Sequence, residues 1–445
     1  MNSQFSAFYD RFYLVFRGIF VFFLILFLLI PQQLIKELIK ERKYRQQEVK
    51  EEILSKWASE QTIRGPLIMI PKYKDINKPS EGFDHIWIKP DELTINGNIQ
   101  PNIKHRSIYS VVLYQSKLKF NGKFKNPAMD TNAATNGGYL VNKAQVVISI
   151  SDYRGLTENI VLTSNGQNTD FRTNPYDTRF ISNSISAPIN LTGGTDTSQD
   201  FAFDLNIKGY EQINIEPYAN KVNATINSDW QRPSFIGSIL PQNQNTTNGF
   251  DAQWNFIDVR KTVPDRFNDE FNEIGEINSL GVKLLQGQDH YSKTERSIKY
   301  AILIITLTFV VYVFIELLQK KRINVLQYVL VGAALLVFYF LLLSISEYLG
   351  FNIAYAIASA AVILQISIYT GTVFKSIKAG FVFGILISAL YVYIFSLIQL
   401  EDYALLAGSV GIFFILTLIM IFSRKIAKDK ADNKEALEIK QDKME

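Results

Sequence analysis

Few residue types that perform metal or thiol chemistry occur in this chain of 445 residues, which contains three histidines and no cysteine. His85, His105 and His290 are irregularly spaced, and no His-Glu-x-x-His string is present. Hydrolytic metal sites usually combine His with Asp and Glu, and a zinc–thiolate site or a thiol nucleophile requires Cys. The sequence therefore predicts no metal site, no bound cofactor and no thiol catalysis.

Serine-based and nucleotide-dependent catalysis are equally unsupported. The chain contains no Gly-x-Ser-x-Gly string and no phosphate-binding glycine-rich loop followed by Lys-Ser or Lys-Thr. Ser116 and Lys119 fit Ser-x-x-Lys by letters, but the residues around them alternate like a strand, which places the two side chains on opposite faces. We expect no catalytic residues and a protein that is not an enzyme.

Large apolar side chains in a hydrophilic region are candidates for a binding surface. Four such residues could line a groove for a peptide, a glycan or a partner protein: Trp230, Pro233, Phe235 and Trp254. The same side chains would also suit a sheet corner or a hydrophobic core. We predict an interaction surface from these residues, with core packing as the alternative.

Polar residues in apolar segments form a second set of candidates, because ionisable groups in hydrocarbon are costly and often functional. Glu316 lies four residues before Lys320, so the two could pair along a helix. Glu347 lies at the end of an apolar segment, and Gln365 lies deeper and could hydrogen-bond a neighbouring helix. Anchoring and helix packing account for all three, and a proton or ion pathway is the alternative. The lack of a charge near the middle of any apolar segment argues against an ion-coupled pump.

The elements that carry these candidates include apolar segments long enough to cross a membrane. Charged residues make up 20% of the chain, but only nine occur between Tyr300 and Phe422. A spanning helix needs about 20 apolar residues to cross roughly 30 Å of hydrocarbon. The sequence predicts six spans: Phe12–Ile30, Tyr300–Leu318, Val325–Ser346, Phe351–Gly371, Ile377–Ile398 and Tyr403–Phe422.

The first span is predicted to be an uncleaved signal anchor. Its basic start and apolar core, Gly18–Ile30, also fit a cleaved signal peptide. The residues that follow, Pro31 to Leu34, contain no small-x-small cleavage site.

Basic residues in the short loops predict the orientation of the spans. They lie between spans two and three, between spans four and five and after span six. Because basic loops remain in the cytoplasm, both termini are predicted to be cytoplasmic and residues 32–299 to be outside. The basic residues between Lys36 and Arg45 break this pattern, but the rule weakens where a long domain is translocated. The loop residues are Lys320, Lys321, Arg322, Lys375, Lys378, Arg424, Lys425, Lys428 and Lys430.

Residues 32–299 are predicted to form one hydrophilic insertion. Leu34–Lys56 is charged with recurring apolar residues, which indicates a helix that packs an apolar edge against another element. Pro66 is predicted to end this helix. Alternating runs follow, with Asn121-Gly122 as a hairpin signal and Asn165-Gly166 as a turn, and they predict an antiparallel β-rich, sandwich-like domain. The predicted divisions are a signal anchor (1–31), a juxtamembrane helix (32–62), a β-rich domain (63–299), a five-helix transmembrane bundle (300–422) and a charged cytoplasmic tail (423–445).

Several strings of residues resemble the CreD family of bacterial inner-membrane proteins. The most specific runs from Ser228 to Gly237 and is followed by Leu240-Pro241, Gly249-Phe250 and Trp254. The order and spacing of the strings, with one large domain after span one and five clustered spans, extend the resemblance over nearly the whole chain up to Ser423. The other strings are Gly65–Pro71, His85–Pro90, Val147–Leu156, Lys299–Leu303, Gln327-Tyr328 and Ser346-Glu347.

The resemblance implies an inner-membrane protein that maintains the integrity of a bacterial cell envelope, in a context of envelope stress and of tolerance to colicins and β-lactams. It implies no catalytic residue, and it makes the outside compartment the periplasm. The expected partners are the lipid bilayer and either another envelope protein or a cell-wall component. The net charge of +4 is too small to argue for nucleic acid.

Two other functions remain open. A transporter or flippase-like protein would use the helical bundle, and a polar cavity in the bundle would favour it. A sensor would bind a stress signal in the periplasmic domain and would need a separate partner, because the tail carries no kinase or nucleotide signature. The ligand and the oligomeric state do not follow from the sequence.

Overall fold

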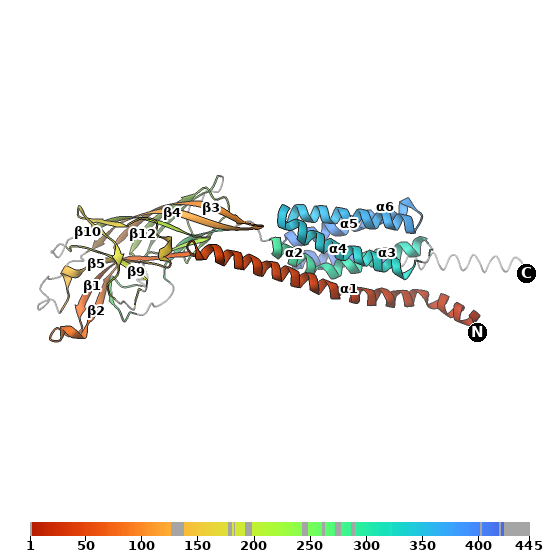
Figure 1. Ribbon diagram of the computed structural model, residues 1–445, viewed down its shortest axis with the longest axis horizontal. Coiled ribbons are helices and arrows are strands. Elements are labelled where there is room, and N and C mark those ends of the chain that lie inside the picture. The colour runs from red at the N-terminus through yellow and green to blue at the C-terminus, as the bar shows by residue number, and fades with distance from the viewer. Residues whose placement is uncertain are drawn as a thin grey trace, which may run out of the picture. The chain divides into compact units, whose positions relative to one another are not determined.

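The computed structural model divides the chain into two compact units (Figure 1). The helical unit comprises Met1–Tyr44 and Gln288–Glu445, and the β-rich unit comprises Arg45–Gly287. The structure describes residues 2–125, 138–176, 180–181, 183–191, 198–242, 248–259, 263–271, 277–285, 290–319, 321, 323–400, 403–417 and 420–421. The predicted tail after Ser423 lies outside these residues.

The helical unit is built from membrane-capable helices. Within the described residues, five helices are long and apolar enough to span a membrane: α1 (Asn2–Ser55), α3 (Ala301–Gln319), α4 (Val325–Leu349), α5 (Phe351–Val373) and α6 (Ile377–Gln399). The predicted membrane bundle is confirmed. A shorter apolar helix, Ala404–Thr417, stands at the place of the sixth predicted span, and the end of that span lies partly outside the described residues. A short amphipathic helix, α2 (His290–Lys299), precedes α3.

Local capping explains where two of these helices begin. Asn324 caps α4 with a capping box, in which its side chain bonds the first turn and Gln327 bonds back. Ser376 caps α6 by accepting a hydrogen bond from the backbone N–H of Ala379. The interior of the bundle is filled by large aromatic side chains, among them the fully buried Phe338, Tyr339 and Tyr391.

The first helix, α1, continues from the first predicted span to Ser55 without a break, with Pro31 inside it. The prediction that Pro66 marks its end is wrong, because Pro66 lies within strand β1 (Gln61–Tyr73). The end of α1 is instead capped from the β-rich unit to which its last residues belong. Arg154 Nη1 donates to the carbonyl oxygens of Ser55 (3.1 Å) and Leu54 (3.4 Å) in the last turn of the helix. The Leu54 oxygen also accepts from the backbone N–H of Trp57 at 3.2 Å.

The apolar edge predicted for this helix end is confirmed. Ile53, Leu54 and Trp57 pack on a small buried cluster of the β-rich unit, formed by Val111, Leu113 and Tyr210. The Trp57 indole also donates to the carbonyl oxygen of Gly209 at 3.1 Å. The helix end is therefore attached to the β-rich unit by side-chain packing as well as by hydrogen bonds.

Asp152 stabilises the same junction between the end of α1 and the strands of the β-rich unit. Its carboxylate accepts hydrogen bonds from Arg154 Nη2 at 2.7 Å, from the hydroxyl of Ser59 at 2.9 Å and from the backbone N–H of Ser59 at 3.0 Å. The guanidinium of Arg154, followed by the two Ser59 donors, holds the pKa of Asp152 well below its usual range despite the opposing effect of burial.

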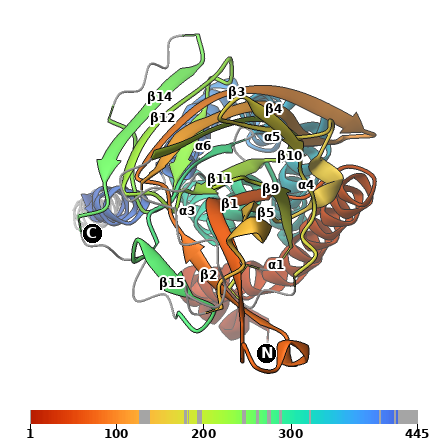
Figure 2. The same ribbon diagram turned by 90° about the vertical axis from the view of Figure 1, so that its left-hand side faces the viewer.

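The β-rich unit is a sandwich of two sheets (Figure 2). In the described residues the first sheet has nine strands in the order β13-β16-β11-β1-β5-β9-β8, with β2 beside β1 and β15 beside β2. The second has seven strands in the order β14-β12-β3-β4-β10-β6-β7. Neighbouring strands are antiparallel, as predicted, except for the parallel pairs β1–β11 and β12–β3.

The strands have the following bounds. The first sheet contains β1, β2 (Phe83–Ile88), β5 (Gln145–Ile150), β8 (Arg172–Thr173), β9 (Ser184–Pro188), β11 (Gln212–Glu216), β13 (Pro233–Ile236), β15 (Arg266–Asn268) and β16 (Leu280–Leu284). The second contains β3 (Glu92–Arg106), β4 (Tyr109–Lys125), β6 (Val161–Ser164), β7 (Gln167–Asp170), β10 (Ser198–Tyr210), β12 (Lys221–Ser228) and β14 (Phe250–Ile257).

The central strands of the first sheet are covered on both faces. In β1, Ile68 and Ile70 belong to the large core between the sheets, whereas Leu67 and Met69 belong to a second cluster on the opposite face. This second cluster includes Trp87 and is covered by aromatic residues from the segments around β15 and before β9. Burial on both faces explains why β1 is a continuous apolar run and not an alternating one.

The two Asn-Gly pairs have different roles. Asn165 and Gly166 form the predicted turn between β6 and β7, and both have positive φ angles. The prediction of a hairpin at Asn121-Gly122 is wrong, because β4 runs straight through this pair. A Cβ atom on Gly122 would lie 2.4 Å from the carbonyl oxygen of Glu92 and 2.6 Å from the Phe201 ring. Glycine is needed here for close packing in the sheet.

Candidate functional site

The residues predicted to form an interaction surface gather at one corner of the sandwich. Strand β13 is the outermost strand of the first sheet, and β14 is the outermost strand of the second. Figure 2 shows β14 at the edge of its layer, beside β12. The corner therefore contains the chain from Trp230 through β13 together with β14, which follows it in sequence.

Aromatic contacts join the two edge strands. The Phe235 ring of β13 lies edge-on to Phe250 and Trp254 of β14, with centroid distances of 5.7 Å and 5.9 Å. The Trp254 indole donates to the carbonyl oxygen of Ile239 at 3.0 Å, and this bond holds the segment after β13 against β14. The structure thus brings Phe235 and Trp254 together.

The four predicted surface residues differ in exposure. Trp254 is 0% exposed and belongs to the core between the sheets, so the prediction that it forms part of a surface is wrong. Its side chain lies on the inner face of β14, where alternate residues are buried. Trp230, Pro233 and Phe235 are half-buried, and the two aromatic side chains pack against the same core. These three residues remain predicted surface residues.

A tight turn next to β13 shapes the corner. Gly237 has a φ of 101°, and a Cβ atom there would lie 2.5 Å from the carbonyl oxygen of Ser279. Beyond it, the Ser238 hydroxyl donates to the carbonyl oxygen of Ile277 at 3.0 Å and accepts from the backbone N–H of Ser279 at 2.8 Å. The chain after β13 is therefore held in one conformation.

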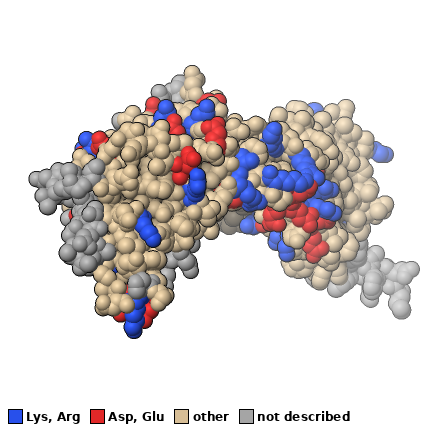
Figure 3. Space-filling model, turned by 60° about the vertical axis from the view of Figure 1, so that its left-hand side comes forward, with Lys and Arg blue, Asp and Glu red and all other residues tan. Residues whose placement is uncertain are grey.

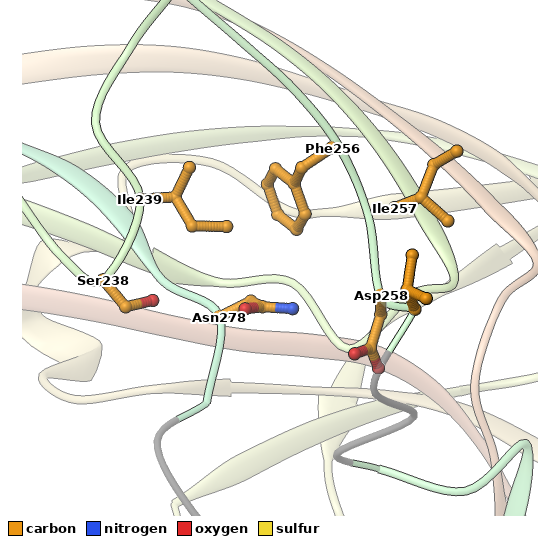
Figure 4. Close-up of a pocket in the computed structure, with 7 residues that line it drawn as sticks. Ser238, Ile239, Phe256, Ile257, Asp258 and Asn278 are labelled. Carbon is orange, nitrogen blue, oxygen red and sulfur yellow. The ribbon is translucent and has the colours of Figure 1, made fainter.

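A pocket of about 260 Å³ opens at this corner (Figure 4). Figure 4 shows the polar side chains of Ser238 and Asn278 together with Ile239, Phe256 and Ile257 around it. Ile257 is 64% exposed and Val259, which also lines the pocket, is 83% exposed. The pocket therefore combines exposed apolar side chains with neutral hydrogen-bonding groups.

The acidic residue of this pocket is neutralised by a buried lysine. Asp258 Oδ2 lies 3.2 Å from Lys89 Nζ, and the two side chains are 7% and 0% exposed. Lys89 also donates to the carbonyl oxygen of Val263. On the face shown in Figure 3, Lys and Arg are interspersed with Asp and Glu, and much of the β-rich unit carries neither. The pocket at this corner therefore suits a ligand whose contacting surface is uncharged and partly apolar.

The outer edge of β14 is partly covered by its own chain. The backbone N–H of Gln242 donates to the carbonyl oxygen of Gln253 at 2.7 Å, and the Gln242 side-chain amide donates to the carbonyl oxygen of Asn255 at 2.9 Å. A partner that adds a strand to β14 would need these two carbonyl oxygens as hydrogen-bond acceptors, and both already accept from Gln242. Recognition at this corner must therefore use the pocket and its apolar rim.

A buried histidine, His85, lies beside the second cluster of the first sheet. His85 Nδ1 is 2.6 Å from Asp269 Oδ2, and the Trp87 indole donates to Asp269 Oδ1 at 2.7 Å. Burial raises the pKa of Asp269, but the hydrogen bonds from His85 and Trp87 outweigh it, so the pKa is lower than usual. No group of three His, Cys, Asp or Glu side chains in the described ranges could hold a metal ion.

These residues explain one of the strings noted in the sequence. His85, Trp87 and Lys89 all belong to the string His85–Pro90, and each holds the chain between Asp258 and Asp269. Their role was missed because the partners lie 169 to 184 positions away in sequence. An alternating strand with polar residues on its buried face was the only signal that could have indicated them.

Among the polar residues of the bundle, Glu316 is buried and fully engaged. It is 4% exposed, and its Oε1 lies 2.9 Å from Arg17 Nη2 of α1 and accepts from the backbone N–H of Ile323 at 3.0 Å. The Tyr328 hydroxyl donates to Oε2. Lys320, the partner predicted for Glu316, lies outside the described residues. Arg17 belongs to the basic start of the first predicted span, and a charge within an apolar span is the signal that could have indicated its buried partner.

The other two polar candidates are less buried. Glu347 lies at the end of α4 and accepts a hydrogen bond from the Tyr291 hydroxyl of α2 at 3.2 Å, with Arg42 Nε at 3.6 Å. Gln365 is exposed on α5 and is not turned toward a neighbouring helix. Glu347 therefore connects helices at the end of the bundle, whereas Gln365 faces the surroundings of the helical unit.

Comparison with known proteins places this arrangement in a family. The family model described as "Inner membrane protein CreD" matches residues 13–428. The "Inner membrane protein CreD" of Escherichia coli (strain K12) is 30% identical over 394 residues, which cover 86% of each chain. Two crystal structures of an M1 zinc metallopeptidase from Deinococcus radiodurans share 7% and 6% identity with TM-scores of 0.23 and 0.21. They cover 44% of this chain and 42% and 41% of theirs.

Proposed function

The chain belongs to the CreD family of inner membrane proteins, and we propose on this premise that it maintains the integrity of the bacterial cell envelope without catalysing a reaction. The working part would be the β-rich unit, and the context would be envelope stress and tolerance to β-lactams or colicins. Multi-pass insertion in the inner membrane follows from the family and from the apolar helices.

The proposal requires the β-rich unit to lie in the periplasm. Lys321, between α3 and α4, donates to the carbonyl oxygen of Phe374, between α5 and α6. Two basic loops therefore lie at the same end of the bundle, as the positive-inside rule requires of cytoplasmic loops. An orientation with both termini inside and residues 32–299 outside is consistent with this contact.

One observation carries the proposal: the pocket at the corner of β13 and β14 has exposed apolar residues beside uncharged hydrogen-bonding groups. Two residues that line it are strongly exposed, Ile257 at 64% and Val259 at 83%. Exposed apolar side chains that cluster around a pocket are typical of sites that contact another macromolecule. We propose that a polypeptide segment of another envelope protein binds here.

The bundle favours this assignment over a transporter. Its interior contains fully buried aromatic side chains from several helices, including Tyr312, Phe338 and Tyr391. A transporter would need a polar path or broken helices near the middle of the membrane. A sensor stays open as a related function, because α1 is one helix whose last turn is capped by the β-rich unit.

Photo-crosslinking in living cells tests the proposal. A photoreactive amino acid at Val259 should capture a specific envelope protein, because this side chain is exposed at the pocket. The matched control is the same amino acid at Val161, which is exposed on β6 of the same unit. Equal products from both positions, or none from Val259, would rule out a partner at this corner, and capture of a cell-wall glycan would replace the protein partner.

A further inference from the structure

A groove between α5 and α6 lies outside the proposed site. It has a volume of about 670 Å³ and opens to the surroundings of the helical unit. Its walls are apolar and strongly exposed, with Ile377 at 90%, Phe381 at 69% and Ile368 at 67%. Side chains of this kind on a membrane-spanning surface face hydrocarbon.

Small residues form the floor of this groove. A Cβ atom on Gly380 would lie 2.6 Å from the carbonyl oxygen of Ser367 and 3.0 Å from the Cα of Gly371, and one on Gly384 would lie 2.8 Å from the Ser367 hydroxyl. The two backbones therefore approach closely and leave a channel between the large side chains on either side.

The length of the groove suits one leaflet. Its lining on α5 extends from Ile363 to Thr372, which is about 14 Å at a rise of roughly 1.5 Å per residue. Half of a hydrocarbon core of roughly 30 Å is about 15 Å. A single acyl chain would follow the groove from the headgroup level to about the middle of the bilayer.

The mouth of the groove is basic. Lys375 and Lys378 lie where α5 and α6 are joined, and both are exposed. Neither lysine takes part in a salt bridge within the described residues. Ile377, which lies between them in sequence, lines the groove. Lys321 reaches the same connection through its bond to Phe374. Lysines at the headgroup end of an apolar groove complement a lipid phosphate.

We propose that the α5–α6 groove binds an anionic phospholipid, with one acyl chain in the groove and the phosphate between Lys375 and Lys378. A second copy of the chain fits less well, because a symmetric contact would bring the same lysines against each other. The helix Ala404–Thr417 contacts another face of α6, where the Tyr393 hydroxyl donates to the carbonyl oxygens of Ala407 and Gly408 at 3.2 Å.

Lipid retention by the purified full chain tests this proposal. The chain is reconstituted in nanodiscs of equal parts phosphatidylglycerol and phosphatidylcholine, transferred to detergent and analysed for retained lipid by mass spectrometry. The wild type should retain phosphatidylglycerol preferentially. Lys375→Gln with Lys378→Gln should weaken this preference about tenfold or more. The matched control, Lys36→Gln with Lys40→Gln, removes two exposed lysines of α1 and should leave the preference unchanged.

A second variant separates the groove from its charges. Gly371→Leu places a side chain where the nearest atom to a Cβ is 3.7 Å away, so the helices can accommodate the Cβ while the rest of the side chain fills the groove. It should reduce retention of both lipids. Equal retention of the two lipids by the wild type, an unchanged preference in the lysine variant, or undiminished lipid retention in Gly371→Leu would each overturn the proposal. If the lysine variant fails to fold, loss of the wild-type preference at high salt supplies the same test.

Discussion

Arg17 in α1 and Glu316 in α3 form a buried ion pair that links the first span to the helical bundle, with 2.9 Å between Nη2 and Oε1. The guanidinium also lies 4.8 Å from the centre of the Tyr328 ring, whose hydroxyl bonds the same carboxylate. Two charges taken out of water are tolerated only when their partners are well placed. The pair therefore makes the position of α1 in the bundle specific.

Removing one member of this pair should be far more harmful than removing both. Glu316→Ala leaves Arg17 buried and unpaired, and we expect a loss of about 3–5 kcal/mol in the free energy of unfolding. Arg17→Met combined with Glu316→Leu should recover most of it, because apolar side chains can replace a buried pair. Thermal unfolding of the full chain in detergent measures both. The exposed pair Arg45–Glu48 provides the control, since Glu48→Ala should cost less than about 1 kcal/mol. Equal losses in the single and double variants would contradict the pairing.

The same pair predicts that the first span is retained. A signal peptide removed by cleavage would leave Glu316 buried without Arg17, at the cost just described. We expect the chain isolated from membranes to have the mass of the whole sequence, 50.8 kDa. Intact-mass spectrometry of a chain purified by its C-terminus measures this directly. A mass reduced by the roughly 15–30 residues of a cleaved signal would show that the pair is absent from the mature protein.

Asp152 should make the stability of the β-rich unit depend on pH. Its pKa is lowered in the folded state, chiefly by Arg154. The carboxylate therefore contributes stability that is fully present above its unfolded pKa of about 3.9 and is lost as the pH falls through the lower folded pKa. At pH 7, Asp152→Asn should cost about 2 kcal/mol, because charged hydrogen bonds are lost.

Tryptophan fluorescence measures this effect, because all four tryptophans, Trp57, Trp87, Trp230 and Trp254, lie in the β-rich unit. Urea unfolding at pH 7 and at about pH 2, well below the unfolded pKa, should show a smaller acid-induced loss in Asp152→Asn than in the wild type. The control is Asp204→Asn, whose side chain is 65% exposed and 4.0 Å from Lys119. Parallel loss of stability in the wild type and in Asp152→Asn would exclude the proposed coupling.

Two glycines that follow asparagine should respond differently to substitution. Gly122→Ala forces a methyl group against Glu92 and Phe201 and should destabilise the β-rich unit by about 3 kcal/mol. Gly166→Ala meets no atom within 4 Å and strains only a φ of 76°, so about 1 kcal/mol is expected. The same fluorescence measurement compares them. A larger loss for Gly166→Ala would mean that turn geometry, not sheet packing, limits stability.

This contrast shows what the sequence could and could not predict. The spans and the turn at Asn165-Gly166 depend on neighbouring residues, so a local pattern was sufficient. Gly122 has the same local pattern, but its role depends on β3 and β10, which are distant in sequence. The same limit applies to Pro66, which marks no helix end because the chain has already turned into a strand.

The candidate site was predicted only in part, for the same reason. Trp230 and Trp254 look alike in sequence, and only the register of β14 against β12 buries the second. The link between Arg17 and Glu316 joins residues 299 positions apart. Pairing between distant helices follows from packing, and local hydrophobicity carries no information about it.

The binding role of the corner can be separated from its role in folding. Phe235 packs on Phe250 and Trp254, so Phe235→Ala should lower the free energy of unfolding by about 2 kcal/mol, less than for a fully buried phenylalanine, and should lower the amount of protein.

Val259→Asp changes a side chain that is 83% exposed and should leave the free energy of unfolding within about 0.5 kcal/mol of the wild type. If the pocket binds a partner, Val259→Asp should nevertheless abolish envelope function in a deletion strain at a normal protein level. The control is Val161→Asp. Val161 is 39% exposed and lies on β6, which four strands separate from β14 in the same sheet, so this variant should keep that function. Full activity of Val259→Asp, measured as growth under β-lactam or colicin challenge, would show that the pocket is not the working surface.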